Sequence, residues 1–188
     1  SSEFAHITTG KVIEMFSLNI GTVRNKKNFM DHGDIEGASR YIDNALDSLP
    51  FESMRTLIGV GGTFRALTRA LMKKEDYPLK KLHGCSTNKE TFNTFCNAIM
   101  EASPKKLKSL NIKADRFDTI KPGTLILQRV SMRLEVEEFI CSGVGVREGV
   151  YLSDLLRNSA DRFPHNYNPS VRYLLDTYAT FSNHSVEC

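Results

Sequence analysis

The chain has 188 residues, of which 40% are hydrophobic and 25% are charged, a balance typical of a globular protein with one good core. The formal net charge of +3 is too small to indicate a nucleic-acid partner. No apolar run is long enough to span a membrane, and no signal peptide opens the sequence. Composition therefore sets aside nucleic-acid-binding and membrane proteins, and leaves enzymes and interaction modules open.

The cysteines lie far apart, with no CxxC pair and no histidine at ligand spacing; they are Cys85, Cys96, Cys141 and Cys188. This pattern argues against a zinc site and against a disulfide framework. A reducing, cytoplasmic environment is the simplest interpretation.

The first part of the chain predicts a β-hairpin from Phe4 to Ile20, turning at Thr9-Gly10. Its core face is expected to carry Phe4, Val12, Phe16 and Leu18. The segment from Gly21 to Phe29 breaks the alternation and contains three basic residues, so we expect a solvated loop in which Arg24 could reach an anion. The spacing of apolar residues then predicts a helix from Asp34 to Leu49, closed by Pro50.

The stretch from Arg55 to Leu71, RTLIGVGGTFRALTRAL, has the most informative pattern. Thr56-Leu57-Ile58 predicts a buried strand, and Gly59-Val60-Gly61-Gly62 predicts a sharp turn. Thr63 is expected to cap the helix that follows, whose inward residues are Phe64, Leu67 and Leu71. A strand, a glycine turn and a helix N-terminus place unpaired N–H groups and a positive dipole end at one point, which suits an anion. The same pattern also occurs where two glycines only connect a strand to a helix.

The middle of the chain predicts mainly helices. A loop from Glu75 to Ser86 precedes a helix that begins at Ser86 or Thr87 and ends near Met100, and another helix begins near Ser103-Pro104. A third helix, Gly123 to Met132, is apolar nearly all round and should lie in the core. The Pro122-Gly123 pair at its head suits either an anion or close helix packing, and packing is the simpler interpretation.

A short strand, Glu138 to Cys141, leads into a second glycine turn, Ser142 to Gly149, and a helix from Val150 to Leu156. Arg147 in this turn could anchor phosphate, but ion pairing with Glu148 is the commoner role of such a residue. The last amphipathic segment, Val171 to Phe181, needs a partner surface.

Taken in order, these motifs resemble the exopolyphosphatase / guanosine-pentaphosphate phosphohydrolase (Ppx/GppA) family. The resemblance rests on LIGVGGT at 57–63, RFD at 116–118 followed by Pro122-Gly123, and GVREG at 145–149. Ser1-Ser2-Glu3-Phe4 resembles the tail of the family's GGGSxE motif, and SLNIGTVR at 17–24 also matches the family. The match covers roughly residues 1–157. Lys27 stands where the family usually carries a glutamate.

The resemblance implies an α/β fold of the actin-like, ribonuclease-H-like type, with a mixed sheet flanked by helices. Residues 1–157 would form the second of two similar domains, and residues 158–188 would begin a short helical extension. The first domain would be absent from this chain and would be its partner in the intact protein.

The resemblance also implies that the intact protein removes the terminal phosphate from inorganic polyphosphate or guanosine pentaphosphate, using Mg²⁺ and an attacking water. Glu3 would be catalytic and would act on the metal or on the water. The phosphate-binding residues would be Ser1, Ser2, Gly61, Gly62, Thr63 and Arg116. The chain by itself is expected to be inactive.

Two alternatives remain open on the sequence. An actin-like ATP-binding module, of the sugar-kinase or chaperone type, uses a similar glycine turn to hold adenosine. A non-catalytic dimerisation domain would use the glycine turns only for packing, and a homodimer is left open in either case.

Overall fold

The computed structural model describes residues 1–160, 162–168 and 171. The chain divides into two compact units, Ser1–Gly145 and Val146–Cys188, and each is described by itself.

The first unit opens with the expected hairpin, in which β1 (Ser2–Thr8) pairs antiparallel with β2 (Lys11–Leu18). Thr9 and Gly10 form the turn with positive φ angles of 50° and 74°. Leu18 is buried, and Phe4 and Phe16 pack against the core, as predicted. The prediction for Val12 is wrong: it is 55% exposed, because it lies at the turn end of the hairpin, beyond the reach of the core.

The segment expected to be a basic loop is instead helix α1 (Thr22–Asn28), followed by the short 3-10 helix η1 (Met30–His32). Asn25 donates its amide hydrogen to the carbonyl of Gly21, at 2.9 Å, and its side chain is fully buried. Helix α1 packs against α6 (Phe117–Arg133). Tertiary packing thus makes a helix from residues with no apolar periodicity.

The next helix, α2 (Ile35–Leu46), agrees with the prediction at its start. Asp34 caps it by accepting a hydrogen bond from the amide of Gly37 at 2.8 Å, and Ala38 and Ile42 are buried as expected. The helix ends before Leu49, which is nevertheless buried.

The second sheet has the strand order β3-β5-β4, where β3 is Thr56–Gly59, β4 is Ser86–Asn88 and β5 is Glu138–Cys141. Strand β3 is parallel to β5, and β4 is antiparallel to β5. Both β3 and β5 were predicted as strands, but the prediction that β3 is buried is wrong: Ile58 is 56% exposed, and only Gly59 of β3 is buried. The expectation that Ser86 or Thr87 begins a helix is wrong, because these polar residues pair with β5 and leave Asn88 to cap helix α4 (Lys89–Glu101).

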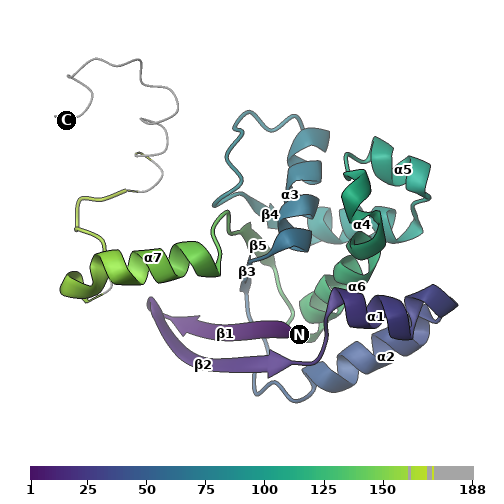
Figure 1. The fold of residues 1–188 in the computed structure, drawn as a ribbon, viewed down its shortest axis with the longest axis horizontal. Coiled ribbons are helices and arrows are strands. Elements are labelled where there is room, and N and C mark those ends of the chain that lie inside the picture. The colour runs from purple at the N-terminus through teal and green to yellow at the C-terminus, as the bar shows by residue number, and fades with distance from the viewer. Residues whose placement is uncertain (161, 169–170, 172–188) are drawn as a thin grey trace. The chain divides into compact units, whose positions relative to one another are not determined.

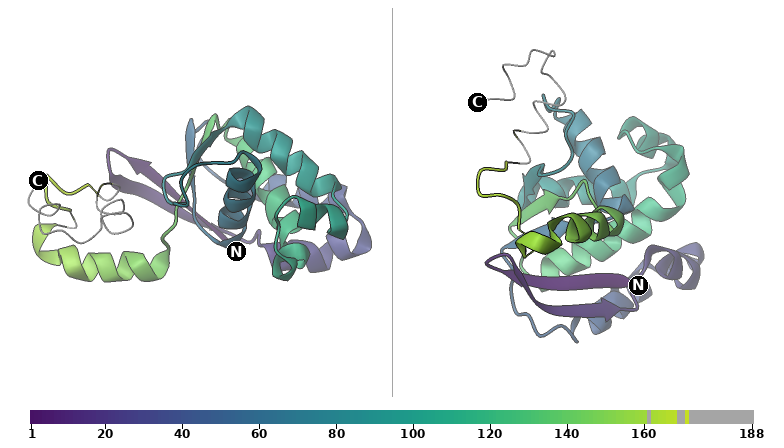
Figure 2. Two further views of the ribbon diagram at one scale, coloured as in Figure 1. Left: turned by 90° about the horizontal axis from the view of Figure 1, so that it is seen from above. Right: turned by 60° about the vertical axis from the view of Figure 1, so that its left-hand side comes forward.

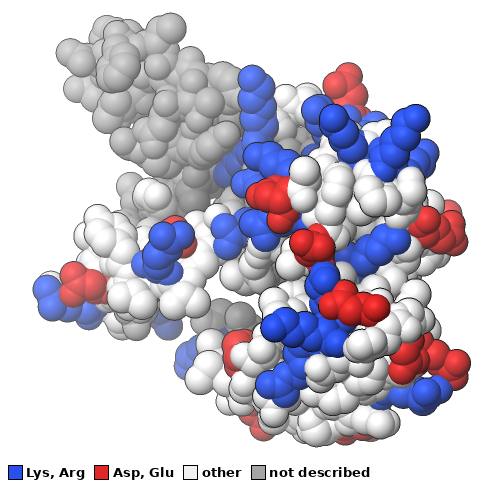
Figure 3. All heavy atoms as spheres, turned by 45° about the vertical axis from the view of Figure 1, so that its right-hand side comes forward, with Lys and Arg blue, Asp and Glu red and all other residues white. Residues whose placement is uncertain are grey.

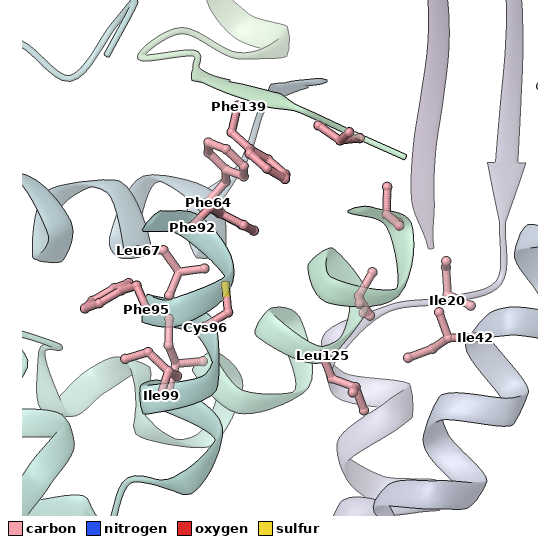
Figure 4. Close-up of a cluster of buried hydrophobic side chains, with 14 of the residues drawn as sticks. Ile20, Ile42, Phe64, Leu67, Phe92, Phe95, Cys96, Ile99, Leu125 and Phe139 are labelled. Atoms are coloured by element: carbon pink, nitrogen blue, oxygen red, sulfur yellow. The ribbon is translucent and has the colours of Figure 1, made fainter. Parts of the chain in front are cut away.

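Helices α3 (Gly62–Lys74), α4 and α6 gather on one side of this sheet (Figures 1 and 2). Figure 4 shows Phe139 of β5 pointing toward Phe64 of α3 and Phe92 of α4. The ring centroids of Phe92 and Phe139 lie 3.9 Å apart, and those of Phe64 and Phe92 lie 5.8 Å apart. This aromatic stack joins the sheet to the helices and fixes where β3 ends and α3 begins.

The remaining helices of this unit are α5 (Pro104–Ser109), capped by Ser103 as expected, and η2 (Ala114–Arg116), which leads into α6. Helix α6 begins at Phe117, so the expectation that Pro122-Gly123 forms its head is wrong. The helix continues through Pro122 because flanking helices bury this stretch on several sides.

The second unit contains α7 (Val146–Leu156) and the 3-10 helix η3 (Arg157–Ser159). Helix α7 begins four residues earlier than the predicted Val150, because Arg147, Glu148 and Gly149 are helical rather than part of a turn. Beyond Val171, the predicted amphipathic segment lies outside the described residues. None of the helices within the described ranges is long and apolar enough to cross a membrane.

Candidate functional site

The N-terminus of α3 is a cluster of available backbone N–H groups at the end of β3. Gly61 is the N-cap residue, with φ of 125°, a conformation that favours glycine. Gly61 has no side chain and so provides no side-chain cap for the first turn of α3. The N–H groups of Gly62, Thr63 and Phe64 have no hydrogen-bond partner among the described residues and are available to an anion. The prediction that Thr63 caps the helix is wrong, because Thr63 is already its second residue.

Arg116 lies directly over this helix N-terminus. Its Nη1 atom is 2.8 Å from the position that a Cβ atom on Gly62 would occupy. Among the described residues Arg116 forms no ion pair. The structure therefore brings together Gly62 and Arg116, which are far apart in the sequence, as expected for a phosphate site.

Gly123 of α6 lies where α6 packs closely against α3 and α1, beside the N-terminus of α3. A Cβ atom at this position would lie 2.6 Å from the Thr63 side chain of α3 and 2.9 Å from Cγ2 of Thr22 in α1. The close-packing interpretation of the Pro122-Gly123 pair is thus correct. Packing against α6, rather than capping, is the structural role of the Thr63 side chain.

The start of the hairpin contacts the start of α1. The amide nitrogen of Ser1 is 3.0 Å from the Cβ position of Gly21, and the Ser2 hydroxyl donates to the carbonyl of Ile20 at 2.5 Å. Glu3 is exposed on β1 and accepts a hydrogen bond from Ser17 Oγ on β2 at 3.1 Å. A hydrogen bond from the Ser1 side chain, and then the one from Ser17, lower the pKa of Glu3 below its usual value. Glu3 is therefore ionised at neutral pH.

The predicted site residues fall into two groups joined by packing. One group is Gly61, Gly62, Thr63 and Arg116 around the start of α3, and the other is Ser1, Ser2 and Glu3 at the start of the hairpin. Gly21 and Thr22 connect them, since Gly21 contacts Ser1 and Thr22 contacts Gly123.

Sequence reasoning missed the contribution of Thr22, because α1 was expected to be a loop. It also missed Ser17, which lies opposite Glu3 in the hairpin only because the register shifts by one residue between His6 and Ile7. The turn position alone would place Phe16 opposite Glu3. In the basic segment, Lys26 rather than Lys27 forms an ion pair, with Asp31 at 2.7 Å.

Within the described ranges, no three His, Cys, Asp or Glu residues cluster as a metal site. The hairpin start nevertheless offers hard oxygen donors, the Glu3 carboxylate and serine hydroxyls. Mg²⁺ in proteins commonly takes one or two carboxylates and completes its shell with water and substrate phosphate oxygens. The residues present thus fit a shared, substrate-dependent magnesium site.

A wide hollow of about 530 Å³ lies elsewhere, and Arg55, Asn88, Glu137 and Glu138 are among its lining residues. It opens at the start of β3 and β5, whereas the site residues follow the end of β3. Figure 3 shows Lys and Arg side chains over much of the visible face, with Asp and Glu between them.

Comparison with solved structures identifies the fold. An Aquifex aeolicus PPX-GPPA enzyme is 22% identical with a TM-score of 0.69, and the similarity covers 80% of this chain and 52% of that chain. An exopolyphosphatase from Cytophaga hutchinsonii is 17% identical with a TM-score of 0.64, and the similarity covers 81% of this chain and 53% of that chain. The chain thus has the predicted α/β fold of the actin-like ATPase type and spans about half the length of these proteins.

The model of the Ppx/GppA phosphatase family matches residues 1–158. The chain therefore belongs to this family, as its motifs indicated. A comparison with curated proteins found no match.

Proposed function

We propose that the intact protein removes the terminal phosphate from inorganic polyphosphate or guanosine pentaphosphate by magnesium-assisted attack of water. Membership in the phosphatase family supports hydrolysis of a phosphorylated substrate. The observation that carries the proposal is the position of Arg116 over Gly62 at the N-terminus of α3. Free N–H groups, a helix dipole and an unpaired guanidinium together suit a phosphate group.

In this proposal the first turn of α3 and Arg116 bind phosphate oxygens and balance the negative charge of the substrate. The Ser1 and Ser2 hydroxyls lie at the hairpin start, where Ser1 hydrogen-bonds to Glu3 and Ser2 donates to the Ile20 carbonyl. In this proposal each hydroxyl exchanges that bond for one to a phosphate oxygen when the substrate binds. Bound Mg²⁺ would supply charge neutralisation on the phosphate and polarise the water.

The lowered pKa of Glu3 indicates which of its two expected roles is stronger. An effective general base has a pKa near the working pH, whereas a carboxylate with a lowered pKa accepts protons weakly. We therefore assign Glu3 to holding the magnesium ion and orienting the water.

The similarity covers only about half of each of these relatives, which supports a second group of site residues in a preceding domain. That domain would complete the cleft around the substrate. We accordingly expect no phosphate release from this chain alone.

The test is phosphate release from polyphosphate by the intact protein, comparing wild type with Glu3→Gln. Losing the charged ligand is expected to reduce kcat by about 100-fold or more, while folding is unchanged because Glu3 is exposed. Glu14→Gln is the matched control, since Glu14 is also exposed on the hairpin and is expected to leave turnover unchanged.

The dependence of turnover on Mg²⁺ concentration shows whether Glu3 holds the metal or acts only on the water. If Glu3 holds magnesium, a higher Mg²⁺ concentration partly restores turnover in the Glu3→Gln protein. Normal turnover in that variant at low Mg²⁺ would contradict the assignment of Glu3 to the site.

A further inference from the structure

Helix α3 carries a row of positive charge along one face. Its sequence, GTFRALTRALMKK, contains four basic residues and no carboxylate. Arg65, Arg69 and Lys73 recur at every fourth position, so they lie on one face with about 6 Å between neighbours. Lys74 belongs to a different face, because its Nζ atom lies 5.8 Å from the centroid of the Phe95 ring.

The charges in this row are not neutralised by the described part of the chain. Arg65, Arg69 and Lys73 form no ion pair there, whereas Arg40 on α2 pairs with Glu36 and Arg129 on α6 pairs with Asp43. The Nε atom of Arg65 is buried and has no hydrogen-bond partner among the described residues. Arg69 and Lys73 are exposed. An ordinary solvated helix face mixes both signs of charge, and this one does not.

The row begins at the candidate phosphate site. The amide of Arg65 donates to the carbonyl of Gly61 at 3.1 Å, so Arg65 stands one turn from the glycines that Arg116 covers. From Arg65 to Lys73 the helix rises about 12 Å. Positive charge therefore continues along α3 from the point where a terminal phosphate would bind.

We propose that Arg65, Arg69 and Lys73 bind the distal phosphates of a long polyphosphate chain whose terminal phosphate lies at Gly62 and Arg116. The inference rests on the proposed function and makes it more specific. A linear polyanion with a charge on every phosphorus matches evenly spaced cations on one helix face. Guanosine pentaphosphate carries its phosphates in short runs on a nucleoside and cannot follow the row to Lys73.

Binding of this chain to long-chain polyphosphate and to tripolyphosphate tests the proposal. The first variant is Arg65→Gln/Arg69→Gln/Lys73→Gln. The matched control is Lys105→Gln/Lys106→Gln/Lys108→Gln, which removes three exposed charges from α5. Arg69→Gln/Lys73→Gln is a second variant that leaves the half-buried Arg65 in place, in case the triple substitution affects folding.

The α3 triple variant is expected to bind long-chain polyphosphate about tenfold more weakly and to lower the slope of log K against log salt by about 2. Its affinity for tripolyphosphate is expected to stay unchanged, and the α5 control is expected to bind both ligands as wild type does. Equal weakening in the two triple variants, or unchanged long-chain binding in both α3 variants, would overturn the proposal. Equally strong competition by single-stranded RNA would also overturn it.

A kinetic experiment on the intact protein separates this inference from the proposed function. If wild type releases no phosphate from either polyphosphate or from guanosine pentaphosphate, the proposed function fails. If it is active on guanosine pentaphosphate alone, only the inference fails. If wild type is active and the α3 variant has the wild-type KM for long chains, only the inference fails. Support for both is a raised KM for long chains with KM for tripolyphosphate unchanged.

Discussion

Gly123 lies on the face of α6 that α1 and α3 both contact, and the neighbouring side chains leave no room there for a Cβ atom. In Gly123→Ala the new methyl group would stand 2.6 Å from the Thr63 side chain, so either that side chain or one of the helices must shift. We expect a loss of about 1–3 kcal/mol in the free energy of unfolding, measured by urea denaturation.

The matched substitution is Gly149→Ala in α7, where nothing lies within 4 Å of the new methyl group. Alanine has the higher helix propensity, so this variant is expected to be as stable as wild type or slightly more stable. If Gly123→Ala were equally harmless, the three-helix contact at Gly123 would not be close-packed.

Cys96 on α4 is the most strongly shifted thiol of the described residues. Burial raises its pKa from the usual 9.0 to about 12. Between these two values the unfolded chain releases the thiol proton while the folded protein keeps it, so a rise in pH favours unfolding. The stabilising contribution is complete below pH 9 and disappears as pH rises toward 12.

Urea denaturation across this pH range, comparing wild type with Cys96→Ala, measures the effect. The wild-type protein is expected to lose more stability than the variant as pH rises from 9. The contributions of Cys85 and Cys141 cancel, because both proteins contain them. Parallel pH profiles would contradict the shifted pKa of Cys96.

Among the helices, α2 and α6 are joined by a bidentate ion pair. Arg129 Nε donates to Asp43 Oδ1 at 2.6 Å, and Arg129 Nη2 donates to Asp43 Oδ2 at 2.5 Å. Both side chains are about one-third exposed, whereas Arg40 and Glu36 on α2 pair at a far more exposed position. The first pair therefore holds two helices together, and the second stays within one helix.

Asp43→Asn is expected to reduce the free energy of unfolding by about 1–3 kcal/mol, because a partly buried guanidinium loses its bidentate partner. Glu36→Gln, the control, is expected to cost less than about 0.5 kcal/mol. Thermal or urea unfolding of both variants gives the comparison. A similar loss in both would show that the α2–α6 pair contributes no more than a surface pair.

Apolar periodicity allowed α2 and α3 to be predicted from the sequence, and short runs that end at glycine turns allowed β3 and β5 to be predicted. The sequence did not predict α1 and β4, because neither contains an apolar pattern. Helix α1 buries the polar Asn25, and β4 consists of three polar residues that pair with β5. The start of α6 was misplaced because Pro122 usually marks a helix head, yet here the surrounding helices support it within the helix.

The roles of the candidate site residues stay predictions, and only their positions can be compared with the fold. The resemblance named Gly62 and Arg116, and the fold places them together. It did not indicate that Thr63 packs against Gly123, because that contact depends on the crossing of α3 and α6. Short-range patterns specify elements, and the contacts between elements require the assembled fold.

At the scale of the whole molecule, the described core belongs to the first unit. Every buried hydrophobic residue among the described residues lies between Leu18 and Cys141, and none lies in α7. The family match nevertheless continues through residue 158. The features that identify the family therefore extend beyond the residues that supply the core.

The pairing of β3 with β5 has a consequence for the order in which the protein forms. Thr56 and Glu138 are register partners, so most of the helices of the first unit lie between the two strands in the chain. During synthesis β3 leaves the ribosome long before β5, and the helices between them can form while β3 still has no partner in the described part of the chain. The N-terminus of α3, which follows β3 directly, acquires its final position only when β5 arrives. The proposed phosphate site is thus expected to be among the last parts of the first unit to be completed, near the end of that unit's synthesis.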